Sequence, residues 1–434
     1  MLEQWSMTTG KLMMPGCIQP DADTLNRDCF CITLDREALH SNLEREAADL
    51  DFGANFVGAR QHLFSSTPVF LPQSAVEEMH EIVKAIETAS RLEGYSDAVL
   101  FWAPEIARRD HGPAGAFMGY DFHLDESGPK LIEINTNAGG AFLNAALARA
   151  QKACCTELEQ SVRQAHIDEF ESSVVDMFRS EWVRQRRSGS PRRIAIVDDR
   201  PTEQYLYPEF VLAKQMLRKH GVDAIIADAS VLRYEKGRLT FYGDEIDLVY
   251  NRLVDFSLER PDHAALHAAY RDGAVVVTPS PHNHALLADK RNLTLLSRPA
   301  AMSAFGLPPE LRARLAGIPK TTMVTPGNAD RLWEERNGLF FKPTSGHGSK
   351  AVYRGDKVTK SVWQEIARGG YVAQAFAPPS QRMIKLDGAL TSRKMDVRLY
   401  TYDGQILVVA ARLYQGQATN FRTPGGGFAS VLIV

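Results

Sequence analysis

The stretch "GYDFHLDESGPKLIEINTNAGG", residues 119–140, decides the fold of this chain. Alternating apolar residues on both sides of "DESGP" predict a β-hairpin in which Leu124 lies opposite Lys130. In that register Asp121 lies opposite Glu133, and Asn135 points to the same side of the hairpin. The other side is expected to join the core through Tyr120, Phe122, Leu124, Ile132 and Ile134.

The polar face of this hairpin predicts a metal site. Asp121, Glu133 and Asn135 suit Mg²⁺, which takes carboxylate and amide oxygens and completes its octahedron with water and substrate phosphates. Two carboxylates that face each other across paired strands repel when no cation is present. The alternative is an exposed hairpin face that carries ordinary polar residues.

Length and charge limit the classes of partner. With 434 residues, 44% of them hydrophobic, the chain is expected to form two or three globular domains. Its 50 basic and 53 acidic residues leave a net charge of only -3. That balance provides no electrostatic footprint for nucleic acid or for an anionic membrane, so the expected partner is a small molecule.

The compartment is predicted from the apolar runs and the cysteines. No apolar run approaches the ~18 residues of a membrane span, and the opening residues lack the apolar core of a signal peptide. A cytoplasmic protein is expected. The five cysteines fit a reduced compartment. Neither Cys17, Cys29 and Cys31 nor the pair Cys154 and Cys155 matches a zinc spacing, which favours idle thiols over metal ligands.

The first half of the chain is predicted to contain two regions. Residues 1–110 combine a probable strand, "CFCITLD", with helical periodicity in "SAVEEMHEIVKAIETASRLEG" and contain no motif with an evident chemical role. Residues 111–183 are predicted to hold the hairpin and one helix from about Asn144 to Arg179. The charged, Ser- and Pro-containing run "RQRRSGSPRR", residues 184–193, is typical of a solvated linker at a domain boundary.

Residues 193–319 have the pattern of an α/β domain with a parallel sheet. "IAIV", "AIIA", "IDLVY" and "AVVVTPS" are predicted strands, and the two helical segments between them end at glycines. "DDRPTEQ" follows the first strand, so the glycine fingerprint of a dinucleotide site is absent there. The letters "HNH" at 282–284 lack the dispersed spacing of a nuclease motif and are a coincidence or a helix start.

Residues 320–434 change to an antiparallel pattern. "GLFFKPTSGHGSKAVYRG" predicts two strands around a Gly-rich loop, and "GYVAQAFAPP" predicts a further strand. The next predicted hairpin turns at Asp403-Gly404. A strict two-residue turn places Asp396 and Arg398 on one face and Arg412 on the other, unless a bulge re-aims Arg412.

The Gly-rich loop has the composition of a phosphate site. Gly346 and Gly348 allow backbone amides to approach a phosphate, and Lys342 and Lys350 supply positive charge on either side. The loop does not open a helix as the standard P-loop does, and a plain turn is the alternative.

Together, these segments resemble the ATP-grasp ligases, whose pattern runs Gly-x-Asp, a hairpin, Glu-x-Asn and a glycine. Most of that family places the hairpin after the phosphate loop, whereas here it comes first, an order similar to the circularly permuted eukaryotic glutathione synthetase. The resemblance implies an α/β (α+β) fold, with a permuted ATP-grasp domain of antiparallel sheets and a parallel α/β pre-ATP-grasp domain. Because the two parts of a permuted domain must meet, Glu133 is expected to approach Lys342.

The resemblance also implies roles for individual residues. The magnesium ligands would be Asp121, Glu133 and Asn135. Binding of ATP would fall to Lys290, Lys342, Ser345, Gly346, Gly348 and Gln374. The acyl phosphate and the second substrate would be handled by Arg398, Arg412 and Asn420. Glutathione synthetase has an acidic metal ligand in its glycine loop where this chain has Thr344, Ser345 and Gly346, so the metal shell would rely on Asp121.

The function that this resemblance implies is an ATP- and Mg²⁺-dependent carboxylate-amine ligase that acts through an acyl phosphate. Its partners would be a small-molecule acid and an amine, and a homodimer is left open. A small-molecule kinase with the same ATP site, or a non-catalytic nucleotide-binding protein, is the alternative. The sequence identifies neither the acid nor the amine.

Overall fold

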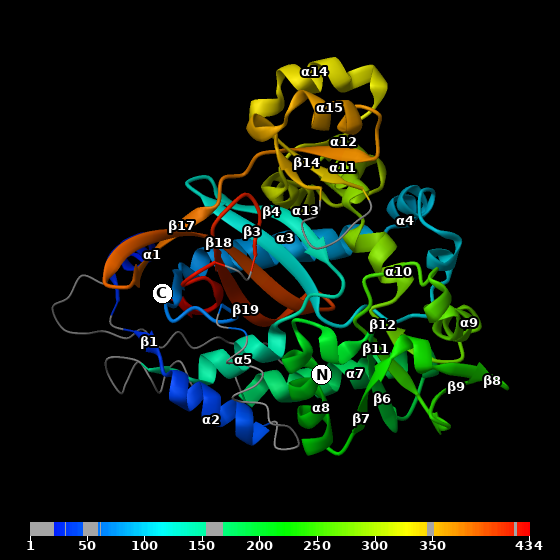
Figure 1. Cartoon of the computed structure of the whole chain (residues 1–434). Coiled ribbons are helices and arrows are strands. Elements are labelled where there is room, and N and C mark those ends of the chain that lie inside the picture. Colours follow the sequence, from blue (N-terminus) through cyan, green and yellow to red (C-terminus); the bar gives the residue numbers. More distant parts are fainter. Residues whose placement is uncertain are drawn as a thin grey trace.

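The computed structural model of the chain describes residues 21–30, 32–46, 60, 62–152, 168–344, 351–420 and 423–434. A seven-stranded main sheet, in the order β2-β20-β19-β18-β3-β4 with β17 paired to β18, lies at its centre (Figure 1). The pairs in this sheet are antiparallel except β2 with β20. Its strands are β2 (Val69–Leu71), β3 (Met118–Asp125), β4 (Gly128–Asn135), β17 (Ser380–Leu386), β18 (Ala389–Tyr402), β19 (Gln405–Tyr414) and β20 (Gly427–Ile433).

The predicted hairpin that carries Asp121 and Glu133 is formed by β3 and β4. Asp121 pairs with Glu133 and Gly119 with Asn135, so the predicted polar face is confirmed. Strand β18 then joins β3, with Arg398 directly opposite Asp121. Segments that are far apart in sequence therefore share one polar face of the main sheet.

Near its turn the hairpin differs from the prediction. Leu124 lies opposite Pro129 rather than Lys130, because a bulge skips Ile132 and shortens the turn. Leu131 consequently takes the core position that was predicted for Ile132. The extra residue turns one side chain away from the core without disturbing the pairs closer to Glu133.

A second bulge decides the position of Arg412. Strands β18 and β19 turn at Asp403 and Gly404, whose φ angles of 49° and 77° fit a type I′ turn. The register then shifts by one residue, which places Arg412 opposite Asp396. The bulge that the sequence left open is confirmed, and both arginines lie on the polar face.

The predicted parallel sheet is confirmed, with the strand order β12-β11-β6-β7. Gly221 and Gly273 follow its helices at positive φ, as expected for C-terminal caps. A three-stranded antiparallel sheet extends this region (Figure 1). The strands are β6 (Arg193–Asp198), β7 (Asp223–Asp228), β8 (Arg233–Glu235), β9 (Arg238–Phe241), β10 (Asp244–Glu245), β11 (Leu248–Asn251) and β12 (Val276–Thr278), and the helices are α8 (Tyr207–Lys219) and α9 (Ala264–Arg271).

A smaller antiparallel sheet, in the order β13-β16-β14-β15, forms a lobe with its own hydrophobic core at the top of Figure 1. It contains β13 (Thr321–Met323), β14 (Leu339–Pro343), β15 (Tyr353–Arg354) and β16 (Tyr371–Ala375), covered by α14 (Ala329–Glu334) and α15 (Lys360–Ile366). Three predicted ATP-binding residues, Ser345, Gly346 and Gly348, lie outside the described residues.

The helix predicted from about Asn144 to Arg179 is wrong. Helix α5 (Ala141–Arg149) ends where Gln151–Lys152 becomes β5 and pairs with β1 (Thr33–Leu34). Helix α7 (Asp168–Arg186) is separate. Pairing with a distant strand overrides local helical periodicity here. The proposed domain boundaries stay predictions.

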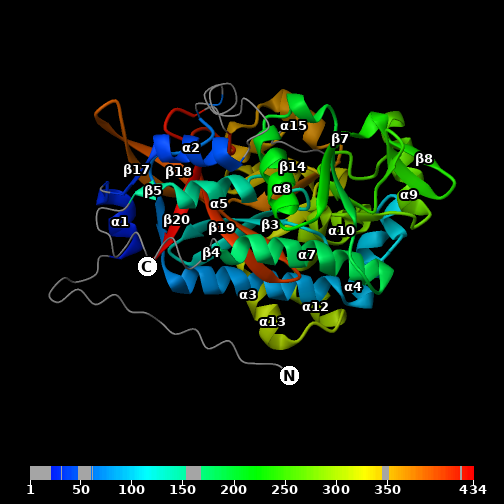
Figure 2. The same cartoon turned by 90° about the horizontal axis from the view of Figure 1, so that it is seen from below.

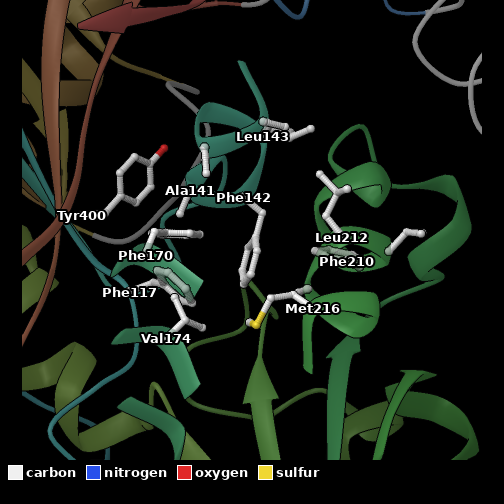
Figure 3. Close-up of a cluster of buried hydrophobic side chains, with 14 of the residues drawn as sticks. Phe117, Ala141, Phe142, Leu143, Phe170, Val174, Phe210, Leu212, Met216 and Tyr400 are labelled. Atoms are coloured by element: carbon white, nitrogen blue, oxygen red, sulfur yellow. The ribbon is translucent and has the colours of Figure 1, made fainter. Parts of the chain in front are cut away.

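The main sheet has a core on each face. On one face the helix predicted at 74–94, now α3 (Gln73–Ser90), packs lengthwise (Figure 2). On the other face α5 carries Phe142 into a cluster with α7 and α8 (Figure 3).

The remaining helices are α1 (Ala22–Asp28), α2 (Arg36–Glu46), α4 (Glu93–Leu100), α10 (Pro281–Asn283), α11 (Leu293–Leu296), α12 (Pro299–Ala304) and α13 (Pro309–Arg314). "HNH" is therefore a helix start. Among the described residues, no helix has the length and apolarity needed to cross a bilayer.

Candidate active site

A cavity of about 1260 Å³ lies where the polar face of the main sheet meets the small sheet and the carboxyl edge of the parallel sheet. Every predicted site residue that the structure describes lines it: Asp121, Glu133, Asn135, Lys290, Lys342, Gln374, Arg398, Arg412 and Asn420. They come from β3, β4, β14, β16, β18, β19 and two connecting segments. The fold thus brings the predicted set together, while the individual roles stay predictions.

The two parts of the permuted domain meet at Lys342. Its Nζ donates a hydrogen bond to the carbonyl oxygen of Ile132 at 2.6 Å. Ile132 is the bulged residue of β4 and immediately precedes Glu133. The expected approach of Lys342 to Glu133 is confirmed, and the bulge provides the carbonyl that receives the lysine.

Lys342 and Lys290 form a cationic pair beside Glu133. Burial lowers the pKa of Lys342 to about 8, the nearby charge of Lys290 lowers it further, and Glu133 and Asp121 act in the opposite direction. The Nζ of Lys290 lies 3.3 Å from Oε1 of Glu133. One carboxylate does not balance two buried ammonium groups, so the site favours an added polyanion.

Asp121 holds two arginines in place. Arg398 donates to both of its carboxylate oxygens, at 2.5 and 2.7 Å, and Arg412 donates to Oδ2 at 2.9 Å. Burial would raise the pKa of Asp121, but the two guanidinium groups outweigh burial and lower it. The exposed fractions of the Asp121, Arg398 and Arg412 side chains are only 2%, 8% and 11%, so this cluster is rigid and pre-organised.

Asp396 provides the second support for Arg412. The Nε of Arg412 donates to Oδ1 of Asp396 at 2.7 Å, and the hydroxyl of Thr419 donates to the other oxygen. The two carboxylates therefore fix the guanidinium plane of Arg412 from two sides. Arg412 also lines the cavity, so its N–H groups that do not bind these carboxylates are available to a ligand.

The surroundings of Asp121 do not suit a metal ligand. Its two oxygens accept hydrogen bonds from Arg398, Arg412 and Asn135, the last at 3.1 Å. Glu133 is about one-third exposed, and no described residue donates to the amide oxygen of Asn135. Among the described residues, no group of three His, Cys, Asp or Glu side chains could hold a metal ion. A magnesium ion would therefore depend on Glu133, Asn135, water and ligand oxygens.

Gln374 offers a buried polar group to a ligand. Only 2% of it is exposed, and its Nε2 has no hydrogen-bond partner among the described residues. Phe340 pairs with Gln374 across β14 and β16, so an aromatic ring lies beside the amide. An amide with an aromatic neighbour suits the edge and the face of a nucleotide base.

Asn420 is engaged within its own loop. Its Nδ2 donates to the carbonyl oxygens of Gln415 and Ala418, and its Oδ1 accepts from the hydroxyl of Thr423. The structure therefore shows Asn420 shaping the loop that borders the cavity. Its predicted catalytic role stays a prediction.

Arg252 is a cavity residue that was not predicted from the sequence. It follows β11, is 6% exposed, and donates to the carbonyl oxygen of Ala138 and the hydroxyl of Tyr250, both at 3.3 Å. Its Nε has no partner among the described residues. The available signal was a charged residue directly after a buried parallel strand, the edge at which α/β sheets bind ligands.

Comparisons with known proteins agree with the permuted order of the elements. No protein-family model and no curated protein matches the sequence. A glutathione synthetase-like effector from Globodera pallida, in its apo form, is 11% identical with a TM-score of 0.56 over 92% of this chain and 98% of its own. The fold is that of a glutathione synthetase-like protein. The predicted α/β class and the resemblance to permuted ATP-grasp proteins are confirmed at the level of fold.

Two further solved structures align less well. A putative γ-glutamylcysteine synthetase from Methylobacillus flagellatus is 11% identical over 78% of this chain and 85% of its own, with a TM-score of 0.45. The ATP-grasp ligase PsnB, complexed with minimal precursor, Mg and ADP, is 14% identical over 55% of this chain and 87% of its own, with a TM-score of 0.30. At such identities the likeness concerns the fold alone.

Proposed function

We propose that the protein is an ATP- and Mg²⁺-dependent ligase that joins a small-molecule carboxylate to an amine through an acyl phosphate. One observation carries the proposal. Two buried arginines, fixed by Asp121 and Asp396, line the same cavity as the lysine pair and Glu133. Such a site can hold a polyphosphate and, beside it, a carboxylate whose acyl phosphate gains an oxyanion when the amine attacks.

The residues present fit ATP and a magnesium ion. Gln374 and Phe340 would receive the base, since the Gln374 amide is buried and its Nε2 has no partner among the described residues. Lys290 and Lys342 would receive the phosphates, since burial disfavours the charged form of Lys342 unless an anion is bound. Glu133 and Asn135 would hold the ion. When bound, Mg²⁺ would neutralise negative charge on the phosphates, and water would complete its coordination shell.

Arg398 and Arg412 are proposed to stabilise the oxyanion that forms on the carbonyl oxygen of the acyl phosphate when the amine attacks. Their guanidinium planes cannot rotate freely, because Asp121 and Asp396 accept their other N–H groups. Donors that are oriented before reaction cost no reorganisation when charge develops. Asp121 then acts as a positioning residue for the arginines rather than as a metal ligand.

The product mixture tests the ligase against a kinase. A ligase releases ADP together with free phosphate only when both an acid and an amine are supplied. A kinase on the same site would release ADP with a hydroxyl compound and retain the phosphate on its product. A screen of acid and amine pairs and of hydroxyl compounds, followed by ADP and phosphate release, distinguishes the two, and no turnover with any of these compounds would contradict both.

Glu133→Gln is expected to lower turnover by a factor of about 10² or more, because a magnesium contact at the transferring phosphate is lost. Its melting temperature should stay near that of the wild type, since Glu133 is about one-third exposed and contacts Lys290 alone among the ion pairs described. Glu126→Gln, at the exposed turn of the same hairpin, is the matched control and should leave both quantities unchanged. Equal turnover in Glu133→Gln and wild type would remove Glu133 from the site.

A further inference from the structure

The carboxyl edge of the parallel sheet contributes an unusual carboxylate to the cavity. Asp198 ends β6, lines the cavity and is only 8% exposed. Its Oδ1 accepts a hydrogen bond from the backbone N–H of Asp199 at 2.8 Å, and no described residue donates to its other oxygen. Asp198 is thus a buried carboxylate with an unused oxygen beside a ligand-sized space.

None of the described charged side chains near Asp198 forms a hydrogen bond or an ion pair with its side chain. His263 lies between Asp199 and Asp255, at 2.8 and 2.7 Å, and Arg260 pairs with Asp199 at 2.5 Å. Arg252 follows the adjacent strand, but its guanidinium donates to a carbonyl and a hydroxyl rather than to Asp198. No described cation forms an ion pair with Asp198.

The charged form of such a buried carboxylate is unfavourable unless a ligand provides an opposite charge or hydrogen-bond donors. Burial raises the pKa of Asp198 to about 7 and the charge of Asp199 acts in the same direction, whereas the N–H of Asp199, Arg252 and His263 oppose the rise. A cation brought by a ligand would restore the charged form and supply hydrogen-bond donors to the unused oxygen. A protonated amino group has both properties.

We propose that Asp198 is a specificity-determining residue of the cavity, and that its unused oxygen receives a protonated amino group of the substrate. The inference rests on the proposed function only in calling the bound compound a substrate. Binding of the amino group at Asp198 can be measured without ATP. A failure of recognition and a failure of ligation are therefore seen separately.

The test is calorimetric titration with pairs of compounds that differ in the amino group: L-alanine with propionate, L-glutamate with glutarate, and ethanolamine with ethylene glycol. The wild type should bind at least one amino compound more tightly than its partner. Asp198→Asn should weaken that binding about 10- to 100-fold, the scale of a lost charge-assisted hydrogen bond. Asp228→Asn is the matched control, because Asp228 ends the neighbouring strand β7 opposite Asp198 and does not line the cavity. It should bind as the wild type does.

The pH dependence of binding to the wild-type protein gives a second readout. The amino group stays protonated near neutral pH. Affinity for the amino compound should therefore rise with pH through about 7, as Asp198 loses its proton. In Asp198→Asn the rise should disappear.

Three results would overturn the proposal: wild-type protein that binds none of the amines, binding that ignores the amino group, or Asp198→Asn that binds as tightly as wild type. If the protein binds an amino compound more tightly than its partner but never releases ADP, the role of Asp198 is supported and the proposed ligase is contradicted. If ADP is released but Asp198→Asn does not change the affinity for the amino compound, the proposed ligase is supported and the role of Asp198 is contradicted.

Discussion

Lys342 shows how one buried side chain can be shaped for a ligand. A lysine that is 7% exposed and lies near a second lysine is disfavoured in its charged form. Its hydrogen bond to Ile132 offsets part of that cost, and the phosphates proposed to bind there would offset the rest. Lys342 is therefore placed to change its charge with pH and with occupancy.

ATP affinity is expected to depend on the protonation of Lys342. Its pKa in the folded protein is lowered to about 8, so the side chain is charged below that pH and neutral above it. Affinity for a non-hydrolysable ATP analogue should be constant below pH about 8 and fall as the pH rises further. In Lys342→Arg the fall should vanish, because a guanidinium keeps its charge. Titration calorimetry across this pH range measures the effect.

A matched lysine provides the control. Lys360 is exposed on α15 and does not line the cavity. Lys360→Arg should therefore retain the wild-type pH dependence. The same loss of affinity above pH 8 in Lys342→Arg would show that another group is responsible.

At the scale of the element, two single-residue bulges build the site. The bulge at Ile132 turns its carbonyl toward Lys342, and the shift in β19 brings Arg412 to the side of Asp121. Because side chains alternate along a strand, one extra residue moves every later side chain to the opposite face. Without the shift in β19, Arg412 would point into the hydrophobic core beneath the sheet.

Helix α5 links the hairpin to the parallel sheet. It starts after Gly140, whose φ is 110° and where a Cβ would lie 2.3 Å from the ring of Phe428. The buried carboxylate of Glu209, on α8, accepts from the N–H groups of Phe142 and Leu143 at this helix start. Figure 3 shows Phe142 inserted between the rings and aliphatic side chains of the neighbouring helices.

Phe142→Ala is expected to lower the free energy of unfolding by about 3–5 kcal/mol, the range for removing a large aromatic side chain from a core. Phe142 is 5% exposed, and its ring lies 5.3 Å from that of Phe117 and 5.5 Å from that of Phe170. Urea denaturation measures the change. Phe101→Ala serves as control, because Phe101 is 83% exposed and should change stability by no more than about 0.5 kcal/mol. Equal effects of the two changes would contradict the described packing.

At the scale of the whole molecule, Arg382 connects the first described segment to the main sheet. This side chain of β17 is fully buried. It donates to the carbonyl oxygens of Pro68, Asn26 and Cys29 at 2.8, 2.5 and 2.6 Å. Burial lowers its pKa to about 10. Arg382 thus donates hydrogen bonds to carbonyl groups at the end of α1 and just before β2.

Arg382→Met should lower the free energy of unfolding by about 3 kcal/mol or more, since several buried carbonyl groups lose their donor at once. Denaturation in urea, followed by fluorescence, gives the value. Arg238→Met is the matched control, because Arg238 is an exposed arginine on a strand. An unchanged urea midpoint in Arg382→Met would show that the segment contributes little to stability.

The sequence by itself predicted the elements whose pattern is local. Alternation and turn residues predicted the β3–β4 hairpin with Asp121 opposite Glu133, and Asp403-Gly404 predicted the second hairpin. Apolar runs with C-terminal glycines predicted the parallel sheet and its helices. The order of the motifs underlies the resemblance to permuted ATP-grasp proteins. The described residues to which that resemblance assigned roles line one cavity. Apart from the order of the motifs, each of these signals acts between neighbours in the chain or across one turn.

The tertiary structure alone decided which partners those residues find. The engagement of Asp121 by two arginines, the bulges, the break between α5 and α7, and the unused oxygen of Asp198 all depend on segments distant in sequence. A carboxylate looks the same in the sequence whether it will meet a metal, an arginine or a substrate. Burial and the nearest opposite charge choose among these, and both are set only when the sheets pack together.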